Sequence, residues 1–129
     1  MIEKKQKHQG PCGQQRQRRG MRLILRPSLL LMLSEGESHG YELYDQLESF
    51  GFESECLDPS IVYRELREME ELGWVKSTWD ENSKGPKKRV YFILDQGRVR
   101  LVEWVDVLKN IQKRMDTLIN RYKKLLKKE

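Results

Sequence analysis

Apolar positions repeat at helical spacing through the first half of the chain and predict short helices. Pro27 suits the first turn of a helix that carries the run SLLLMLSE, and Gly36 ends it. A second helix begins near the run SHGYE, with Glu42 in its first turn, and ends at Gly51. Its apolar positions are Leu43, Tyr44, Leu47 and Phe50.

A third predicted helix has two faces of opposite character. Asp58 is placed as its N-cap and Pro59 as its first helical residue. At about 100° per residue, apolar side chains gather on one face and polar side chains on the other. The apolar face carries Val62, Leu66, Met69 and Leu72, and the polar face carries Ser60, Tyr63, Arg64 and Arg67. We expect the first face to join the core and the second to point outward.

Two runs rich in β-branched and aromatic residues follow, WVKSTWD and RVYFIL. The run ENSKGPKK between them has the residues of a turn, so these segments predict a β-hairpin. The tip of this hairpin is basic, because it carries Lys84, Lys87, Lys88 and Arg89. The fold class predicted by these elements is mainly α with a small β-hairpin.

The last segment, from Asp95 to Lys128, reads as one long helix. Its apolar residues alternate in steps of three and four, as in a heptad seam. The seam is Leu101, Trp104, Leu108, Ile111, Met115, Leu118, Tyr122 and Leu125. A helix of roughly 30 residues extends near 45 Å, too far to be covered by so small a body. We therefore predict a homodimer through this seam, with packing inside the chain as the alternative for the first turn or two.

Length and composition indicate one small domain in 129 residues. We divide it into a flexible basic arm over 1–22, a body over 23–94 and a C-terminal dimerisation helix over 95–129. The arm includes the run GPCGQQRQRRG, which has no apolar periodicity. The chain shows neither a membrane-length apolar run nor an apolar signal core, so we expect it to be cytoplasmic. Cys12 and Cys56 form no disulfide framework, and a redox role for them is only weakly indicated.

Charge is segregated along the chain in a way that the net value of +5 hides. Residues 1–26 carry +7 and residues 27–73 carry −10. Residues 74–100 and 101–129 carry +4 each. This pattern favours a polyanionic partner that touches the periphery rather than the whole surface, with solvated charge as the alternative.

The polar face of the third helix has the chemistry of a nucleic-acid contact. Arginine side chains fit phosphate or guanine edges, and hydroxyl groups bond phosphate oxygens. Ser60, Tyr63, Arg64 and Arg67 are thus candidate DNA-binding residues, and Lys84, Lys87, Lys88 and Arg89 are candidates for contact with the DNA backbone. Glutamates follow at Glu65, Glu68, Glu70 and Glu71, and would stay clear of DNA if only the first half of the helix entered the groove. A solvated helix face is the alternative.

Four runs together resemble the PadR family of transcriptional regulators: LLLMLSEGESHGYELYDQL, PSIVYRELREMEELGWV, GPKKRVYFIL and DQGRVRL. The resemblance implies a winged helix-turn-helix domain over 23–94 in a dimeric repressor that binds DNA. By position it makes Ser60, Tyr63 and Arg64 the recognition-helix contacts and Lys87, Lys88 and Arg89 the wing, whereas His39, Gly40 and Tyr41 begin the preceding helix. Asp95 stands where the family usually has a threonine before the last helix, and we expect it to cap that helix equally well. The arm lies outside the resemblance.

Other chemistry finds little support in the sequence. His8 and Cys12 are four residues apart, but no zinc-binding spacing occurs, so we expect no metal and no cofactor. No catalytic triad, phosphate loop or nucleotide fingerprint is visible, so an enzyme is not expected. The alternative to a DNA-binding repressor is a dimeric ligand-sensing or protein-interaction module with the same fold.

Regulation by a small molecule is a further hypothesis from the resemblance. Some PadR-like proteins bind flat aromatic effectors beside a tryptophan at the dimer interface. Trp104 lies on the predicted dimerisation helix near the body, so it is the candidate effector platform. The alternative is that Trp104 packs in the core against the first helix.

Overall fold

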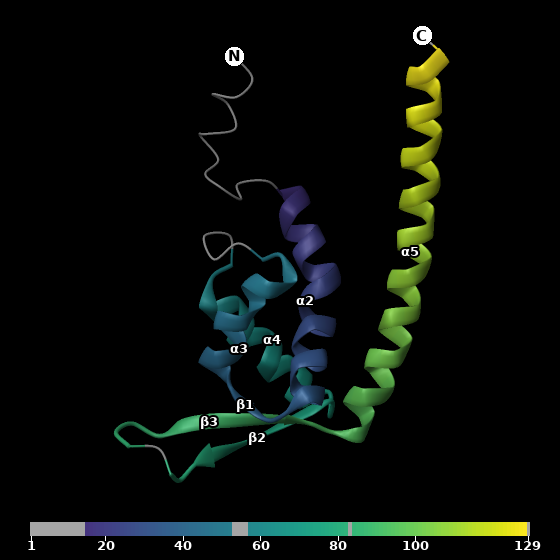
Figure 1. Ribbon diagram of the computed structural model, residues 1–129. Helices are drawn as coiled ribbons and strands as arrows, with labels where there is room; N and C mark the ends of the chain where they lie inside the picture. Colours follow the sequence, from purple (N-terminus) through teal and green to yellow (C-terminus); the bar gives the residue numbers. More distant parts are fainter. Residues whose placement is uncertain (1–14, 53–56, 83, 129) are drawn as a thin grey trace, which may run out of the picture.

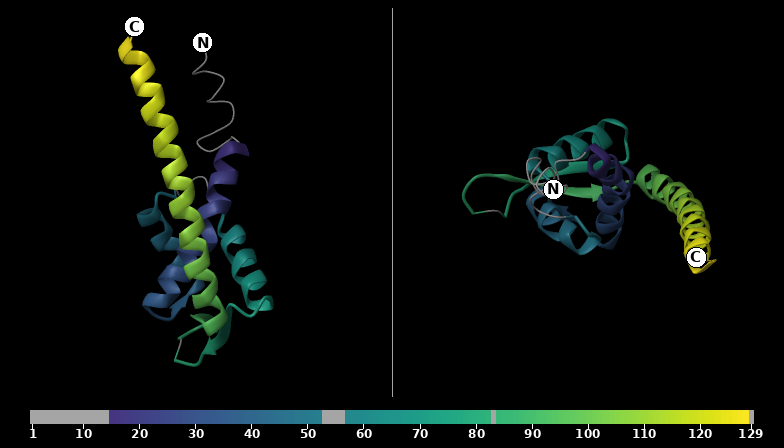
Figure 2. Two further views of the ribbon diagram at one scale, coloured as in Figure 1. Left: turned by 90° about the vertical axis from the view of Figure 1, so that its right-hand side faces the viewer. Right: turned by 90° about the horizontal axis from the view of Figure 1, so that it is seen from above.

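The computed structural model describes residues 15–52, 57–82 and 84–128. Three helices lie above a small antiparallel sheet, and one long helix runs beside them and projects beyond them (Figure 1). Seen from above, the hairpin extends from one side of the body and the long helix lies on the opposite side (Figure 2). The predicted fold class is confirmed. The predictions about His8, Cys12 and Cys56 concern residues outside those that the structure describes.

The first described helix, α2, spans Gln15–Glu35 and is longer than predicted. Pro27 lies inside this helix, so its assignment to the first turn was wrong. Apolar spacing continues across the proline, because Leu25 and Leu29 are four residues apart and both buried. Extending an existing helix needs no new nucleus, and Gln and Arg favour helix, so part of the expected flexible arm is helical.

Helix α3 spans Gly40–Gln46 and continues as the 3₁₀ turn η1, Leu47–Phe50, which ends at Gly51 as predicted. Just before it, residues Ser38–His39 form the short strand β1. A strand of two residues shows no alternation of apolar and polar positions, which is why the sequence did not reveal it.

Helix α4 spans Pro59–Glu71 and begins as expected. The Asp58 carboxylate accepts a hydrogen bond from the backbone N–H of Ser60 at 3.0 Å, which confirms Asp58 as the N-cap. Val62, Leu66 and Met69 are fully buried. Leu72 is not a core residue, because it follows the last turn of the helix and its side chain is 54% exposed.

The sheet has the strand order β1-β3-β2. Strands β2 (Val75–Asp80) and β3 (Lys88–Ile93) form the predicted hairpin, paired from Val75 opposite Ile93 to Asp80 opposite Lys88. β1 adds to the other edge of β3, with His39 opposite Val90. The core joins apolar side chains of α2, α3, α4 and the sheet.

Helix α5 spans Asp95–Lys128, and only Leu94 separates it from β3. The backbone N–H of Arg98 bonds the Leu94 carbonyl at 3.1 Å, so Leu94 is the cap and Asp95 lies in the first turn instead of capping it. The buried Gly97 sits against the start of β2, where a Cβ atom would overlap the carbonyl oxygen of Trp74. This junction fixes the direction in which α5 leaves the sheet.

Candidate nucleic-acid interface

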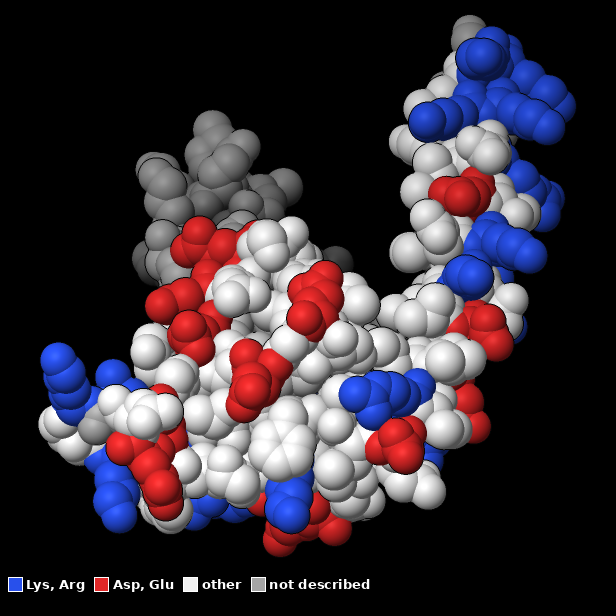
Figure 3. Space-filling view, turned by 60° about the horizontal axis from the view of Figure 1, so that its bottom comes forward, with Lys and Arg blue, Asp and Glu red and all other residues white. Residues whose placement is uncertain are grey.

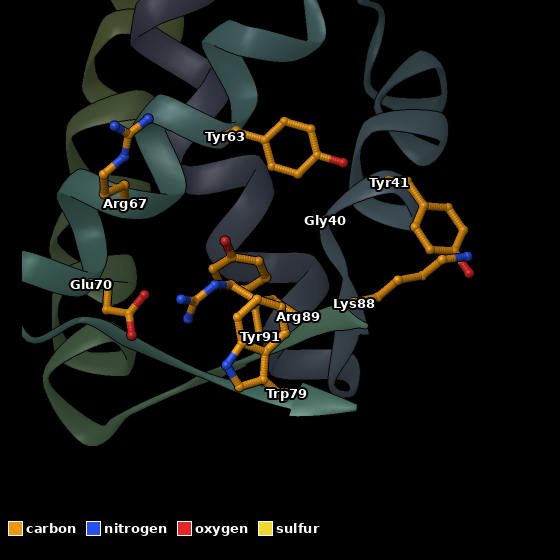
Figure 4. A pocket seen from close by; sticks show the side chains of 9 residues that line it. All are labelled: Gly40, Tyr41, Tyr63, Arg67, Glu70, Trp79, Lys88, Arg89 and Tyr91. Carbon is orange, nitrogen blue, oxygen red and sulfur yellow. The ribbon is translucent and has the colours of Figure 1, made fainter. Parts of the chain in front are cut away.

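An open groove of about 740 Å³ separates helix α4 from the hairpin, and the first turn of α3 borders it (Figure 4). Its lining combines aromatic rings with basic side chains. The lining residues are Gly40, Tyr41, Tyr63, Arg67, Glu70, Trp79, Lys88, Arg89 and Tyr91. The groove therefore brings together the third predicted helix and the predicted wing, which lie far apart in the sequence.

Helix α4 presents the polar face that its sequence predicts. Ser60, Arg64 and Arg67 are exposed, and Tyr63 is 39% exposed. Tyr63 and Arg67 line the groove, whereas Ser60 and Arg64 lie outside its lining. Partial burial raises the pKa of the Tyr63 phenol, so its hydroxyl stays protonated near neutral pH and can donate a hydrogen bond.

The Tyr63 ring is positioned by a close approach of α3 to α4. A Cβ atom at Gly40 would overlap the edge of this ring, so only glycine allows the contact. In Figure 4 the ring of Tyr63 extends from α4 toward the start of α3, where Tyr41 lies. The glycine of the run HGYE thus sets the separation of the two helices at the groove.

The hairpin contributes two cations that rest on aromatic rings. The Lys88 ammonium lies 4.6 Å from the centre of the Tyr41 ring, and the Arg89 guanidinium lies 4.5 Å from that of Trp79. Arg89 also donates to the Ser77 hydroxyl at 2.9 Å. Stacking on a ring and a hydrogen bond together limit the rotamers of Arg89, so its charge is held beside the groove.

Glu70 is the acidic member of the groove, and its charge is engaged within the protein. The Ser77 hydroxyl donates to its carboxylate at 3.0 Å, and the Ser77 backbone N–H donates at 3.2 Å. Glu65 and Glu68 pair with Arg26 of α2, the latter at 2.6 Å. Three of the four glutamates on α4 therefore have partners inside the chain.

Lys84 and Lys87 are exposed in the loop at the hairpin tip and do not line the groove. Figure 3 shows basic side chains at the hairpin tip and along the far part of α5, with acidic side chains over the body between them. Acidic side chains also lie beside the hairpin and along α5 in this view, so the charge segregation inferred from the sequence is repeated only in part on this face (Figure 3).

The sequence missed three rings of the groove as site residues: Tyr41, Trp79 and Tyr91. Trp79 pairs with Arg89 in the strand register, so counting outward from the hairpin turn could have found that contact. Tyr91 is buried, and burial raises the pKa of its phenol. Tyr41 was assigned only to the start of a helix.

The predicted seam of α5 divides into two halves. Leu101, Trp104, Leu108 and Ile111 are half-buried, whereas Met115, Leu118, Tyr122 and Leu125 are between 53% and 70% exposed. Helices α2 and α5 pack together along the first half. The side chains of the second half pack against no other element in the described part of the chain and remain exposed to solvent.

Trp104 packs edge-on against Trp74, with ring centres 6.2 Å apart. Arg26 and Arg100 lie over the Trp74 ring at 5.6 and 5.2 Å. A separate apolar recess of about 240 Å³ lies between α2 and α5 and is lined by Ile24, Pro27, Ser28, Leu31, Phe50, Leu101, Val105 and Leu108. Trp104 is next to this recess along α5 but is not part of its lining.

In the part of the chain that the structure describes, no three His, Cys, Asp or Glu side chains are grouped so as to hold a metal ion. No helix within the same residues has the length and apolar character needed to cross a membrane.

A helical body on a three-stranded sheet, with an exposed hairpin beside an outward-facing third helix, is a winged helix-turn-helix. The model of the PadR-like family of transcriptional regulators matches residues 29–103. The chain belongs to this family, which confirms the resemblance drawn from the sequence.

Three similar proteins illustrate the relationship. The probable transcriptional regulator Rv1176c of Mycobacterium tuberculosis is 37% identical over 84 residues, which cover 64% of this chain and 44% of the relative. The chain thus spans less than half the length of that curated relative.

Two solved structures have the same fold. The PadR-like transcriptional regulator BC4206 of Bacillus cereus is 26% identical, with a TM-score of 0.67 over 77% of this chain and 94% of that one. PadR of Bacillus subtilis in complex with operator DNA is 24% identical, with a TM-score of 0.56 over 64% of this chain and 46% of that one.

Proposed function

We propose that this protein is a homodimeric repressor that binds a specific DNA sequence through α4 and the hairpin. One observation carries the proposal. The exposed polar face of α4 and the cations of the hairpin border the same groove, with Tyr63 and Arg67 on one side and Lys88 and Arg89 on the other. The solved complex of Bacillus subtilis PadR with operator DNA supports it, because that protein has the same fold.

The two sides of the groove have different roles in this proposal. The first half of α4 enters the major groove, where Arg64 and Tyr63 contact base edges and Ser60 contacts phosphate. The hairpin cations contact the DNA backbone and contribute affinity without sequence preference. The internal partners of Glu65, Glu68 and Glu70 reduce the repulsion between α4 and phosphate.

Two copies of the recognition helix require a symmetric operator. The exposed second half of the α5 seam supports a dimer, because large apolar side chains there remain in contact with water in the single chain. Such a dimer would prefer an inverted repeat with half-sites about one helical turn apart, roughly 34 Å, or a multiple of that distance.

Replacing Arg64 or Tyr63 with alanine should weaken specific binding by about 1–3 kcal/mol, because base contacts are lost. Lys87→Ala should instead weaken binding to all sequences alike. It should also reduce the steepness with which the logarithm of the binding constant falls with the logarithm of salt concentration, by about one. Fluorescence anisotropy with the gene's own upstream DNA and with a scrambled duplex, at several salt concentrations, measures both effects.

Lys113→Ala is the matched control, since it removes one exposed positive charge from α5 away from the groove. If the substitutions in α4 and in the hairpin lowered the affinity for the upstream and the scrambled duplex by equal amounts, α4 would not read the bases. If the wild-type protein bound neither duplex, the protein-interaction or ligand-sensing alternative would replace the repressor.

We also propose that a planar aromatic effector releases the repressor by binding near Trp104. Such a ligand can shift DNA binding only if it prefers one spacing of the two recognition helices over another. The apolar recess between α2 and α5 and the edge-on pair of Trp74 and Trp104 support a site at this junction.

Titration with planar aromatic compounds should therefore quench tryptophan emission saturably in the wild type and much less in Trp104→Phe. Trp79→Phe is the matched control, because Trp79 lies in the hairpin. Quenching that survives Trp104→Phe, or no quenching at all, would leave Trp104 as a packing residue against Trp74.

A further inference from the structure

His39 lies between two carboxylates from different elements. Its Nδ1 is 2.8 Å from Oε1 of Glu42 in the first turn of α3, and its Nε2 is 2.8 Å from Oδ2 of Asp80 at the end of β2. The backbone N–H of His39 also donates to the Glu42 carboxylate at 2.9 Å. Both nitrogens of one ring are therefore engaged by acceptors.

This arrangement requires a particular protonation state. A neutral imidazole has one N–H donor and one lone pair, so it can satisfy only one of two ionised carboxylates. The imidazolium donates from both nitrogens and places one positive charge between two negative ones. The geometry thus selects protonated His39 whenever Glu42 and Asp80 are ionised.

The other charged group near the His39 ring is consistent with a protonated ring. Lys88 is the neighbouring cation, because it lies opposite Asp80 in the strand register. Its ammonium rests on the Tyr41 ring, which in turn stacks on the His39 ring at 5.3 Å between centres. The charged groups around the ring are thus Glu42 from α3, Asp80 from β2 and Lys88 from β3.

The contact ties the base of the hairpin to the helices. Asp80 is the last residue of β2, and its other carboxylate oxygen accepts the N–H of Asn82 at 3.0 Å where the turn begins. Glu42 belongs to α3, whose Gly40 sets the position of the Tyr63 ring on α4. A single histidine therefore links the hairpin turn to the face of the recognition helix.

We infer that His39, as an imidazolium, is a positioning residue that holds the hairpin cations in register with α4, so that DNA affinity falls as His39 loses its proton. The inference rests on the proposed function for its DNA-binding consequence, whereas the state of the ring can be measured without DNA. His39 itself need not touch DNA.

The pKa directions agree with this geometry. Hydrogen bonds to Glu42 and Asp80 raise the pKa of His39 above its ordinary 6.5. The contribution of the protonated His39 ring to stability is fully present below pH 6.5. It is lost as the pH rises through the pKa of His39 in the folded state. Hydrogen bonds from His39 lower the pKa of Glu42 and of Asp80. The contribution of these two carboxylates to stability is therefore present when the pH is above their ordinary pKa values, and it is lost as the pH falls through their pKa values in the folded state. The contact is intact between these two limits.

The first experiment follows the ring itself. The chain has two histidines, so His8→Gln leaves His39 as the one imidazole in an NMR titration. We expect His39 to titrate above 6.5 in the folded protein and Asp80→Asn to lower its midpoint. A midpoint at or below 6.5, or one that Asp80→Asn leaves unchanged, would overturn the inference.

The second experiment measures specific DNA affinity between pH 6 and pH 9 at constant ionic strength, in the His8→Gln background. If DNA binding raises the His39 pKa by roughly half a unit to one unit, affinity falls roughly three- to tenfold across the NMR midpoint. Asp80→Asn should bind with little pH dependence, and so should His39→Gln, which keeps a donor but cannot ionise.

The outcomes separate the inference from the proposed function. Binding that is equally tight at every pH, or a fall that persists in Asp80→Asn, refutes the positioning role and leaves the repressor proposal standing. Absence of binding at every pH refutes the proposed function and the role of His39 in it, and the NMR midpoint still decides whether the ring is held between the two carboxylates.

Discussion

Replacing Leu118 with glutamate will convert the proposed dimer into monomers and remove tight binding to an inverted repeat. Leu118 is 70% exposed in the single chain, so the fold of each protomer should survive. In a paired seam each large apolar side chain contributes about 1.5–3 kcal/mol before ordering costs. A carboxylate buried there costs several kcal/mol, so the dimer Kd should rise at least about a hundredfold. Sedimentation velocity at micromolar concentration measures the shift.

Asn120→Glu is the matched control, because it adds the same charge to an exposed position of α5 outside the seam. We expect this variant to sediment as the wild type does. A wild-type monomer at micromolar concentration, or a Leu118→Glu variant that stays dimeric, would show that this half of α5 is not the interface.

The second large effect is expected on stability, from Gly97→Ala. In an exposed helix this change would stabilise by about 0.8–1 kcal/mol, because glycine is a poor helix former. Here the added Cβ would overlap the carbonyl oxygen of Trp74, which also accepts the N–H of Leu94 at 2.9 Å, and would press on Ile93. Backbone cannot yield as a side chain can, so we expect a net loss of about 1–3 kcal/mol in the free energy of unfolding.

Urea denaturation of Gly97→Ala and Gly36→Ala side by side tests this expectation. Gly36 has no heavy atom within 4 Å of the place where its Cβ would lie, so alanine there should change the midpoint little. Equal midpoints for the two variants would mean that the junction between sheet and α5 is loose enough to absorb a methyl group.

Local signals explain what the sequence could predict. Asp58, Pro59 and the apolar spacing of Val62, Leu66 and Met69 act within one helix, so both its start and its buried face follow from neighbouring residues. The hairpin is likewise specified by its turn and its β-branched residues. Of the candidate DNA-binding residues, the structure places Tyr63, Arg67, Lys88 and Arg89 at one groove.

Contacts between distant residues explain what the sequence could not predict. Asp80 is 41 residues from His39, and Glu68 is 42 residues from Arg26, so no local pattern indicates either pair. The start of α2 was misplaced because Pro27 has the same local signature at a helix start and in a helix interior. Leu72 was wrongly assigned to the buried face because the helical spacing of apolar residues in the sequence extends past Glu71, where the helix ends.

The single residue between β3 and α5 has a mechanical consequence. Leu94 alone joins the hairpin to a helix of 34 residues, which is about 51 Å long at 1.5 Å per residue. Any change in the angle between the hairpin and the helix thus pivots at Gly97, which is packed on Trp74 and serves here as the fulcrum. A tilt of about 5° at that fulcrum moves the far end of a helix of this length by about 4 Å. Small changes in packing at the fulcrum are therefore amplified along α5.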